Sequence, residues 1–211
     1  NRLIANPNQD AKTLASGIVD DSHAYYTALD RDTTTFSAID LGKIPALHQA
    51  VQETAKLMTD TLASNRTAID VARTASPYYN DSNFRDLARF ADNLASGSAT
   101  SPLKTKAGEL AAAARATVLN NKVFIVSSDS TTATGSTGLA IYLPKSNTTT
   151  STELGAYGTG MLSNAGTVSG GSTWSAFLNQ YVTSFIGTAV GNFIYKITWD
   201  NAQADLDLLV A

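Results

Sequence analysis

A short apolar run closed by a proline constrains the fold of this chain more than any other stretch. Residues 137–144 read T-G-L-A-I-Y-L-P, and Pro144 closes the run. It is too short for an ordinary helix and rich in strand formers, so it predicts a largely buried strand. A second apolar run, V-F-I-V at residues 123–126, lies just upstream across a polar tract that ends in Gly135. We expect the two runs to be antiparallel neighbours in the middle of a sheet.

The segments before this sheet show helical periodicity. Asn6 and Pro7 supply a cap and a first-turn proline for a helix over about residues 8–29. The apolar residues that recur at helical spacing in it are Leu14, Ala15, Ile18, Tyr25 and Leu29. Such amphipathic segments need a surface to cover, and a sheet provides one.

Residues 33–39 are β-branched and aromatic, which predicts a short strand, and Asp40 stands where a helix cap would follow. The helix after it has an apolar stripe typical of a face packed on a core. The stripe consists of Ile44, Leu47, Val51, Ala55, Met58 and Leu62. Residues 64–75 either continue this helix or begin a new one. Ser76 and Pro77 end it, because the residue before a proline is pushed out of helical geometry.

Two more helices are expected before the apolar strands. The first covers about residues 83–95, with one apolar side and one charged side. The apolar side holds Phe84, Leu87, Phe90, Ala91 and Leu94, and the charged side holds Arg85, Asp86, Arg89 and Asp92. The second opens at Ser101-Pro102, and its alanine-rich middle at 110–116 suits packing against a sheet. Asn120-Asn121 is expected to separate this helix from the strand at Val123.

The composition changes after Pro144. Residues 145–173 are rich in Gly and small hydroxyl residues, which predicts a long loop with a function or high mobility. Helical spacing returns at Trp174, Phe177, Leu178, Tyr181, Val182 and Phe185, and this helix is expected to end at Gly187. Residues 192–199 alternate apolar and polar, and 205–210 do so less clearly, so two final strands are expected.

Composition and charge exclude several classes of protein. The 211 residues, 43% hydrophobic, can bury a core of one domain, with a small part of a second. A net charge of -3 with only 15 Lys and Arg argues against nucleic acid as a partner. No apolar run is long enough for a membrane span. The first residue is not Met, so a processed chain is expected. The low charge with abundant Thr, Ser, Asn and Gly is typical of secreted bacterial proteins.

The residues that could carry chemistry form no recognisable site. His23 and His48 lie on different predicted helices without a partner at metal-ligand spacing, so each is interpreted as a surface or core-edge residue. The chain has no cysteine, which excludes a cysteine nucleophile of its own. The motifs of zinc peptidases, serine esterases and P-loop proteins are absent. We therefore predict no catalytic residue, no metal ligand and no cofactor in this chain, and leave its substrate-binding residues unassigned.

Some weaker patterns remain open. Gly155, Gly158 and Gly160 are interpreted as a flexible loop, since they neither follow a strand directly nor open a helix. Three acidic pairs could do acid and base work only if a cleft forced their ionisation apart. They are Asp20 with Asp21, Asp30 with Asp32, and Asp205 with Asp207. The glycosylation triplets at Asn65, Asn80 and Asn147 matter only if the host glycosylates exported proteins.

Five segments, read in order, resemble the clostripain-like cysteine peptidases. They are N-P-N-Q-D-A-K-T-L-A with the Tyr-Tyr helix after it (residues 6–26), T-F-S-A-I-D-L (35–41), F-R-D-L-A-R-F-A (84–91), G-L-A-I-Y-L-P (138–144) and W-S-A-F-L-N-Q-Y (174–181). The resemblance implies a caspase-like fold, a three-layer α/β sandwich in which amphipathic helices pack on a mixed sheet. Residues 1–187 would be the C-terminal portion of the peptidase domain. Residues 188–211 resemble the first strands of a trailing β-sandwich module, or are edge strands of the main domain.

The resemblance covers only the region downstream of the catalytic His and Cys of that family, so no catalytic residue is carried over. It implies a partner, an N-terminal segment or chain that brings the His and Cys and cleaves a protein or peptide substrate after basic residues. We expect substrate contacts at the strand of residues 33–37 and in the loop after Pro144. The alternative is a secreted binding or surface-assembly protein without chemistry. A glycosidase with paired carboxylates is a third, less favoured interpretation.

Overall fold

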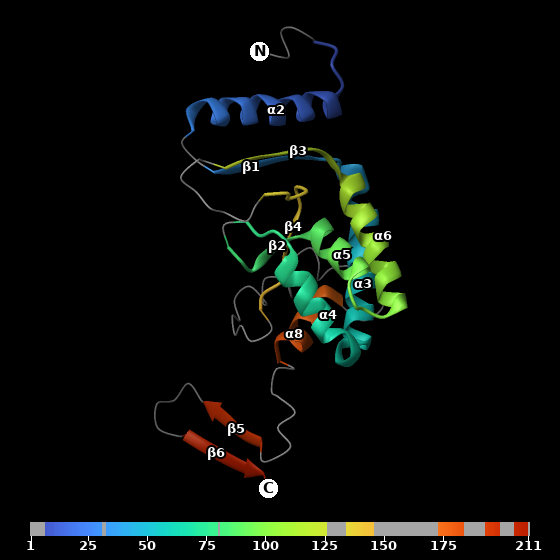
Figure 1. Ribbon diagram of the computed structural model, residues 1–211, viewed down its shortest axis with the longest axis vertical. Coiled ribbons are helices and arrows are strands. Elements are labelled where there is room, and N and C mark those ends of the chain that lie inside the picture. Colours follow the sequence, from blue (N-terminus) through green and yellow to red (C-terminus); the bar gives the residue numbers. More distant parts are fainter. Residues whose placement is uncertain are drawn as a thin grey trace.

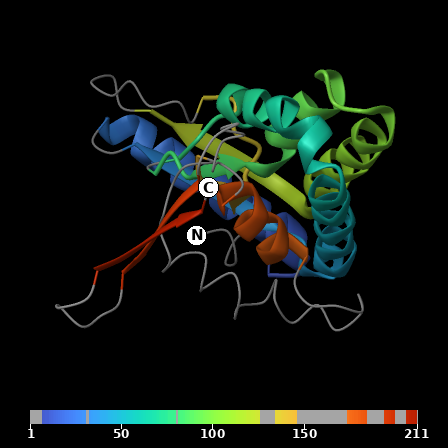
Figure 2. The same ribbon diagram turned by 90° about the horizontal axis from the view of Figure 1, so that it is seen from below.

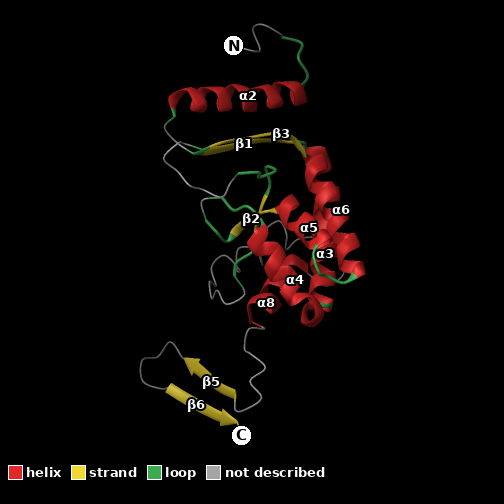
Figure 3. Ribbon diagram, viewed as in Figure 1, coloured by secondary structure: helices red, strands yellow, loops and turns green. Residues whose placement is uncertain are grey.

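The computed structural model combines helices and strands, and helices predominate (Figure 3). Its described strands form three antiparallel pairs of two strands each. The residues that the structure describes are 7–30, 33–79, 81–125, 134–145, 173–183, 193–198 and 205–210. The expected combination of helices and strands is therefore confirmed, while the described strands contain only antiparallel pairs.

The first helix that the structure describes covers one face of a two-stranded ribbon. Strand β1 (Thr34–Ile39) pairs antiparallel with β3 (Val118–Phe124), and α2 (Ala11–Leu29) runs along one face of this ribbon, with the helical core on the other side (Figure 1). The helix begins at Ala11 instead of near residue 8, because the side chain of Asp10 accepts the backbone N–H groups of the first turn.

Three of the five residues in the apolar stripe expected on α2 are exposed: Ile18, Tyr25 and Leu29 are 54%, 61% and 40% exposed. The other two, Leu14 and Ala15, are partly buried. The packed face carries Val19, which is buried, and Tyr26, whose ring lies 5.4 Å from that of Phe36 on β1. Spacing alone could not choose between the two faces, because aromatic and small residues occupy both. We refer to Ile18, Tyr25 and Leu29 as the α2 stripe.

The helical core is built from α3 (Ile44–Asp60), α4 (Leu62–Ala75), α5 (Leu87–Ser96), α6 (Ser101–Thr117) and α8 (Thr173–Thr183). Asp40 caps the short 3₁₀ helix η1 (Leu41–Lys43) that precedes α3, by accepting the N–H of Gly42 at 3.0 Å. The predicted stripe is confirmed in α3, where Leu47, Val51, Ala55 and Met58 are buried and Ile44 is partly buried, while Leu62 is also buried but belongs to α4. The helix is interrupted at Thr61, so α4 is a new helix.

The segment expected to open a helix at residue 83 begins with a strand instead. Phe84–Asp86 form β2, which pairs antiparallel with β4 (Ala140–Tyr142). Helix α5 then starts at Leu87, because the side chain of Asp86 accepts the N–H of Arg89 at 2.9 Å. Arg85 and Asp86, expected on a charged outer face, are consequently buried.

The expected pairing of the two apolar runs is wrong. Helix α6 passes into β3 without a loop, because Thr117 ends the helix and Val118 begins the strand. Asn120 and Asn121 thus belong to β3 and pair with β1. The run at residues 139–143 instead contains β4, which pairs with β2. The alanine-rich part of α6 packs on helices α5 and α3, where small side chains permit close approach, and not on a sheet.

The core closes around α8, drawn in orange in Figure 2, which packs against α3. As the helical spacing predicted, this helix buries Trp174, Phe177, Leu178, Tyr181 and Val182. The indole N–H of Trp174 donates to the carbonyl of Tyr142 at 3.2 Å, so β4 is fixed to α8. Ile141, Tyr142 and Leu143 are buried, as expected for this run.

The last two strands are present as predicted. Strand β5 (Phe193–Thr198) pairs antiparallel with β6 (Asp205–Val210). The expected loop at residues 145–173, including Gly155, Gly158 and Gly160, lies outside the described residues except for its first and last residue. So do Phe185, the expected helix end at Gly187 and the boundary between residues 187 and 188. Among the helices that the structure describes, none has the length and apolarity required to cross a membrane.

Candidate functional site

The two histidines lie apart, on different helices. His23 is on α2, where its ring meets Phe124 of β3 edge-on with centroids 6.5 Å apart. His48 is on α3, and its Nε2 lies 3.2 Å from Nε2 of Gln52. Within the described ranges, no three His, Cys, Asp or Glu side chains gather closely enough to hold a metal ion. Each histidine therefore takes part in packing or a local hydrogen bond.

Among the acidic pairs, Asp20 has described contacts that join two elements. Asp20 accepts a hydrogen bond from Asn120 Nδ2 at 3.0 Å and lies 3.7 Å from the Lys122 ammonium, so it ties α2 to β3. Asp30 has a left-handed backbone conformation at the end of α2. Its partner Asp32 lies outside the described residues, and Asp205 and Asp207 face Thr198 and Lys196 across the β5–β6 pair.

The strand expected to meet substrate is in place, but its backbone is engaged on one side. Thr35 and Ser37 of β1 are exposed, while Ala38 is buried. The Ser37 hydroxyl donates to Asn121 Oδ1 across the ribbon at 2.9 Å. Each of the two strands has its neighbour on one side, so the outer edges of the ribbon remain open among the described strands.

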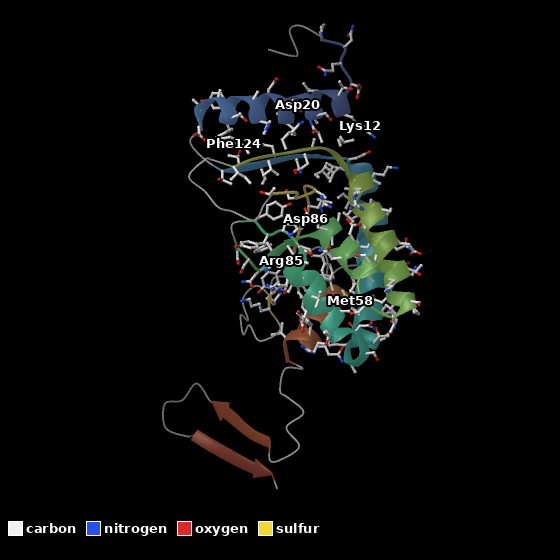
Figure 4. All side chains as sticks on the ribbon, viewed as in Figure 1. Lys12, Asp20, Met58, Arg85, Asp86 and Phe124 are labelled. Atoms are coloured by element: carbon white, nitrogen blue, oxygen red, sulfur yellow. The ribbon has the colours of Figure 1, made fainter. Side chains whose placement is uncertain are left out.

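The most elaborate polar arrangement in the described chain surrounds the carboxylate of Asp86. This buried side chain accepts the Thr137 N–H at 2.5 Å and the Thr137 hydroxyl at 2.7 Å. It also accepts the N–H of Arg89 at 2.9 Å and the phenol O–H of Tyr79 at 3.1 Å. We call Tyr79, Asp86, Arg89 and Thr137 the Asp86 cluster; Figure 4 labels the aspartate at its centre.

The Asp86 cluster fixes residues 134–138, the segment before β4. The Arg89 guanidinium donates to the carbonyl of Gly135 at 2.9 Å. On the other side, Asn121 Nδ2 of β3 donates to the carbonyl of Ser136 at 2.9 Å. Residues 134–138 are therefore held between α5 and the β1–β3 ribbon, and they lead directly into β4.

The chemistry of the Asp86 cluster is that of a structural hub. Burial, followed by the charge of Asp86, raises the pKa of Tyr79 to about 12, so the phenol keeps its proton at neutral pH. A carboxylate that accepts four hydrogen bonds has no free lone pair directed at a substrate. The cluster therefore positions the 134–138 segment and the ribbon above it, and does not act as an acid or base.

This hub is not evident from the sequence, because its members come from three separate segments. The sequence pattern predicts Asp86 on the charged side of a helix and Tyr79 in a loop. One local signal was available: an Asp directly before a helical apolar pattern, with Arg89 three residues later, is a typical helix N-cap position. The contacts from Tyr79 and Thr137 depend on tertiary structure, which local patterns do not encode.

No protein-family model matches the chain, and neither the curated proteins nor the solved structures contain a match.

Proposed function

We propose that this chain is the non-catalytic, C-terminal portion of an exported clostripain-like cysteine endopeptidase. Another segment, joined or separate, would bring the catalytic His and Cys and cleave after basic residues. In the family that the sequence resembles, the imidazole assists attack by a thiolate on the scissile carbonyl, and backbone amides hold the oxyanion. This chain would extend the sheet of a caspase-like sandwich and form one wall of the cleft.

The observation that supports the proposal most is that the β1–β3 ribbon has open edges. A two-stranded ribbon is at best marginally stable alone and exposes unpaired N–H and C=O groups along both borders. The described strands place no third strand beside β1 or β3. A strand from a catalytic segment would pair with one border and convert the ribbon into part of a larger sheet.

The α2 stripe supports the same proposal. Ile18, Tyr25 and Leu29 lie seven and four residues apart, so they share one face of α2, and all are exposed. Large apolar side chains gathered on one face mark an interaction surface more often than single exposed ones do. Docking of a second segment over α2 would bury them.

The test begins with isolation of the chain from its natural source under non-denaturing conditions. We expect intact-mass measurement to find a cysteine-containing segment, either associated or covalently continuous. The preparation should cleave a fluorogenic peptide after Arg or Lys only when a reducing thiol is present, and iodoacetamide should abolish the activity. A single isolated chain that has no cysteine-containing segment and cleaves after neither Arg nor Lys would overturn the proposal.

An interface variant tests the docking surface itself. Ile18→Glu would put a charge into the α2 stripe, and we expect it to weaken association with the catalytic segment about tenfold or more, since burying an unpaired charge is costly. Val71→Glu is the matched control, because Val71 is 60% exposed on α4, outside the stripe. Equal affinities of the two variants would argue against docking over α2.

The second candidate is a secreted binding or surface-assembly protein without chemistry. It is favoured by the absence of any cysteine from the sequence and by the same exposed α2 stripe. In this case the purified chain stays inert toward peptides in the presence of thiol, and Ile18→Glu weakens capture of a partner that carries no peptidase activity.

A further inference from the structure

Two arginines, one on α4 and one on strand β2, are buried within electrostatic range of each other. Arg73 of α4 is 3% exposed and Arg85 of β2 is 5% exposed. Arginine is almost never buried to this extent unless it is paired. The two guanidinium groups are close enough for the charge of Arg73 to act on Arg85, and burial followed by this repulsion lowers the pKa of Arg85 to about 10.

The hydrogen-bond partners of this arginine pair are neutral. Arg73 donates from Nε to the carbonyl of Leu143 at 2.8 Å and from a terminal nitrogen to that of Ser82 at 3.1 Å. Arg85 donates to the carbonyl of Ser76 at 2.9 Å, and its guanidinium lies 5.0 Å from the centre of the Tyr78 ring. Carbonyl dipoles orient these groups without cancelling two positive charges.

One donor of the pair is left over. Nε of Arg85 is buried and has no hydrogen-bond partner. A buried polar group without a partner loses its hydration and gains nothing in return, and the penalty is larger for a charged group. The unpaired Nε–H therefore indicates that an acceptor belongs beside Arg85.

The neighbouring carboxylates do not fill this role. In the part of the chain that the structure describes, neither Arg73 nor Arg85 forms an ion pair. Asp86 follows Arg85 in a strand, so its side chain is on the opposite face, where it is committed to four donors (Figure 4). Asp70 favours the charged form of Arg73, but its carboxylate accepts the Tyr181 hydroxyl at 2.5 Å.

We propose that Arg73 and Arg85 form a binding site for a small oxyanion, namely phosphate, sulfate or a carboxylate. The guanidinium fork matches two oxygens of such an anion, and charge-assisted hydrogen bonds of this kind are among the strongest in proteins. The half-buried ring of Tyr78 lies over the Arg85 guanidinium and forms one wall of the site. A bound anion would offset the two positive charges.

Equilibrium dialysis with labelled inorganic phosphate, at constant ionic strength, tests the site on the full chain. We expect saturable binding of about one phosphate per chain, and a dissociation constant weakened about tenfold or more in Arg85→Gln, the loss of one charge-assisted contact. Arg115→Gln is the matched control, since Arg115 is half-exposed and already paired with Asp92. Competition by sulfate and by acetate separates the inorganic from the carboxylate ligands.

A second measurement needs no variant. Phenylglyoxal modifies arginines when they become accessible, which for a buried side chain such as Arg85 happens through local opening of the structure, and peptide mass spectrometry shows which ones react. Saturating phosphate should slow the modification of Arg85 in the unaltered chain, with little effect on Arg115. Binding that never saturates, phosphate affinities that are equal in Arg85→Gln and Arg115→Gln, or equal reactivity of Arg85 with and without phosphate would overturn the proposal and leave the pair as clamps on backbone carbonyls.

Discussion

At the scale of single residues, the Asp86 carboxylate connects more of the chain than any other side chain in the Asp86 cluster. It caps α5 through Arg89, holds Thr137 through two hydrogen bonds and accepts the phenol of Tyr79. Each of these donors loses this acceptor if the carboxylate is removed. The stability of the β1–β3 and β2–β4 pairs should therefore depend on one charge.

We expect Asp86→Ala to lower the free energy of unfolding by about 3 kcal/mol, because it leaves several buried donors unsatisfied and removes a helix cap. Urea denaturation followed by circular dichroism measures the change. Asp92→Ala is the control: Asp92 pairs with Arg115 at the surface, and its loss should cost under about 1 kcal/mol. Similar losses in both variants would contradict a hub at Asp86.

The phenol of Tyr79 should make stability sensitive to alkaline pH. Its pKa is about 12 in the folded chain, against about 10 when unfolded. Between these values the unfolded chain has released the phenolic proton and the folded chain has kept it. The contribution is therefore complete below about pH 10 and is lost as the pH rises toward 12.

Tyr79→Phe lacks this group, so over that pH window its stability should fall less than that of the unaltered chain. Arg85 titrates in both proteins, and comparing their urea midpoints at several pH values isolates the tyrosine. Parallel curves for the two proteins would show that Tyr79 makes no such contribution.

At the scale of elements, the segment before β4 is held so closely that one glycine is required. Gly138 has φ of +104°, and a Cβ there would lie 2.7 Å from Ser37 Oγ and 3.1 Å from Asn121. The side chains of the ribbon and the backbone of this segment meet at that point. A methyl group must displace the segment or open the ribbon.

We expect Gly138→Ala to destabilise the chain by about 1–3 kcal/mol, the usual range for a strained backbone position. Gly108→Ala is the opposite control, because Gly108 lies in α6 with open space around it and should gain about 0.5–1 kcal/mol. Thermal unfolding of both variants measures the two signs. A stable Gly138→Ala variant would mean that the segment yields at little cost.

The sequence predicts an element well when nearby residues mark its start or its buried face. Ser101 and Pro102 mark the start of α6, Asp40 caps the turn before α3, and the buried stripe of α3 follows its helical period. In each case the signal and the structure lie within a few residues. Strand β1 was equally readable from its β-branched and aromatic residues.

The wrong predictions concern residues whose structure depends on partners far away in the sequence. Residues 84–91 have a helical apolar pattern, yet pairing with Ala140 and its neighbours makes Phe84–Asp86 a strand. The sequence predicts that the strand after α6 begins at Val123, because asparagines are poor strand formers. Pairing with β1 nevertheless includes Asn120 and Asn121 in β3. None of the Asp86 cluster and neither buried arginine was assigned to a site, since charged residues are placed outside by any pattern rule.

At the scale of the whole molecule, the apolar core is unevenly distributed. Buried large side chains concentrate in α3 to α8 and β4, whereas α2 and β1 contribute Val19 and Ala38. Every residue of β3 is only partly buried. The ribbon and α2 therefore have little apolar burial of their own to resist local opening.

Hydrogen exchange should show this difference directly. We expect amides of α2, β1 and β3 to exchange about tenfold faster or more than those of α5 and α6, through opening that leaves the core intact. Mass spectrometry of peptic peptides measures both sets in one experiment. If a catalytic segment docks as proposed, its presence should slow exchange in α2 and the ribbon; equal protection of all these elements in the isolated chain would contradict the prediction.

The direct passage from Thr117 of α6 to Val118 of β3 gives this arrangement a mechanical property. The carbonyl of Thr117 also accepts the N–H of Asp40 at 2.8 Å, so both strands of the ribbon are anchored at the same point. Because no loop separates α6 from β3, we expect a displacement of the ribbon at this end to move the last turn of α6 with it.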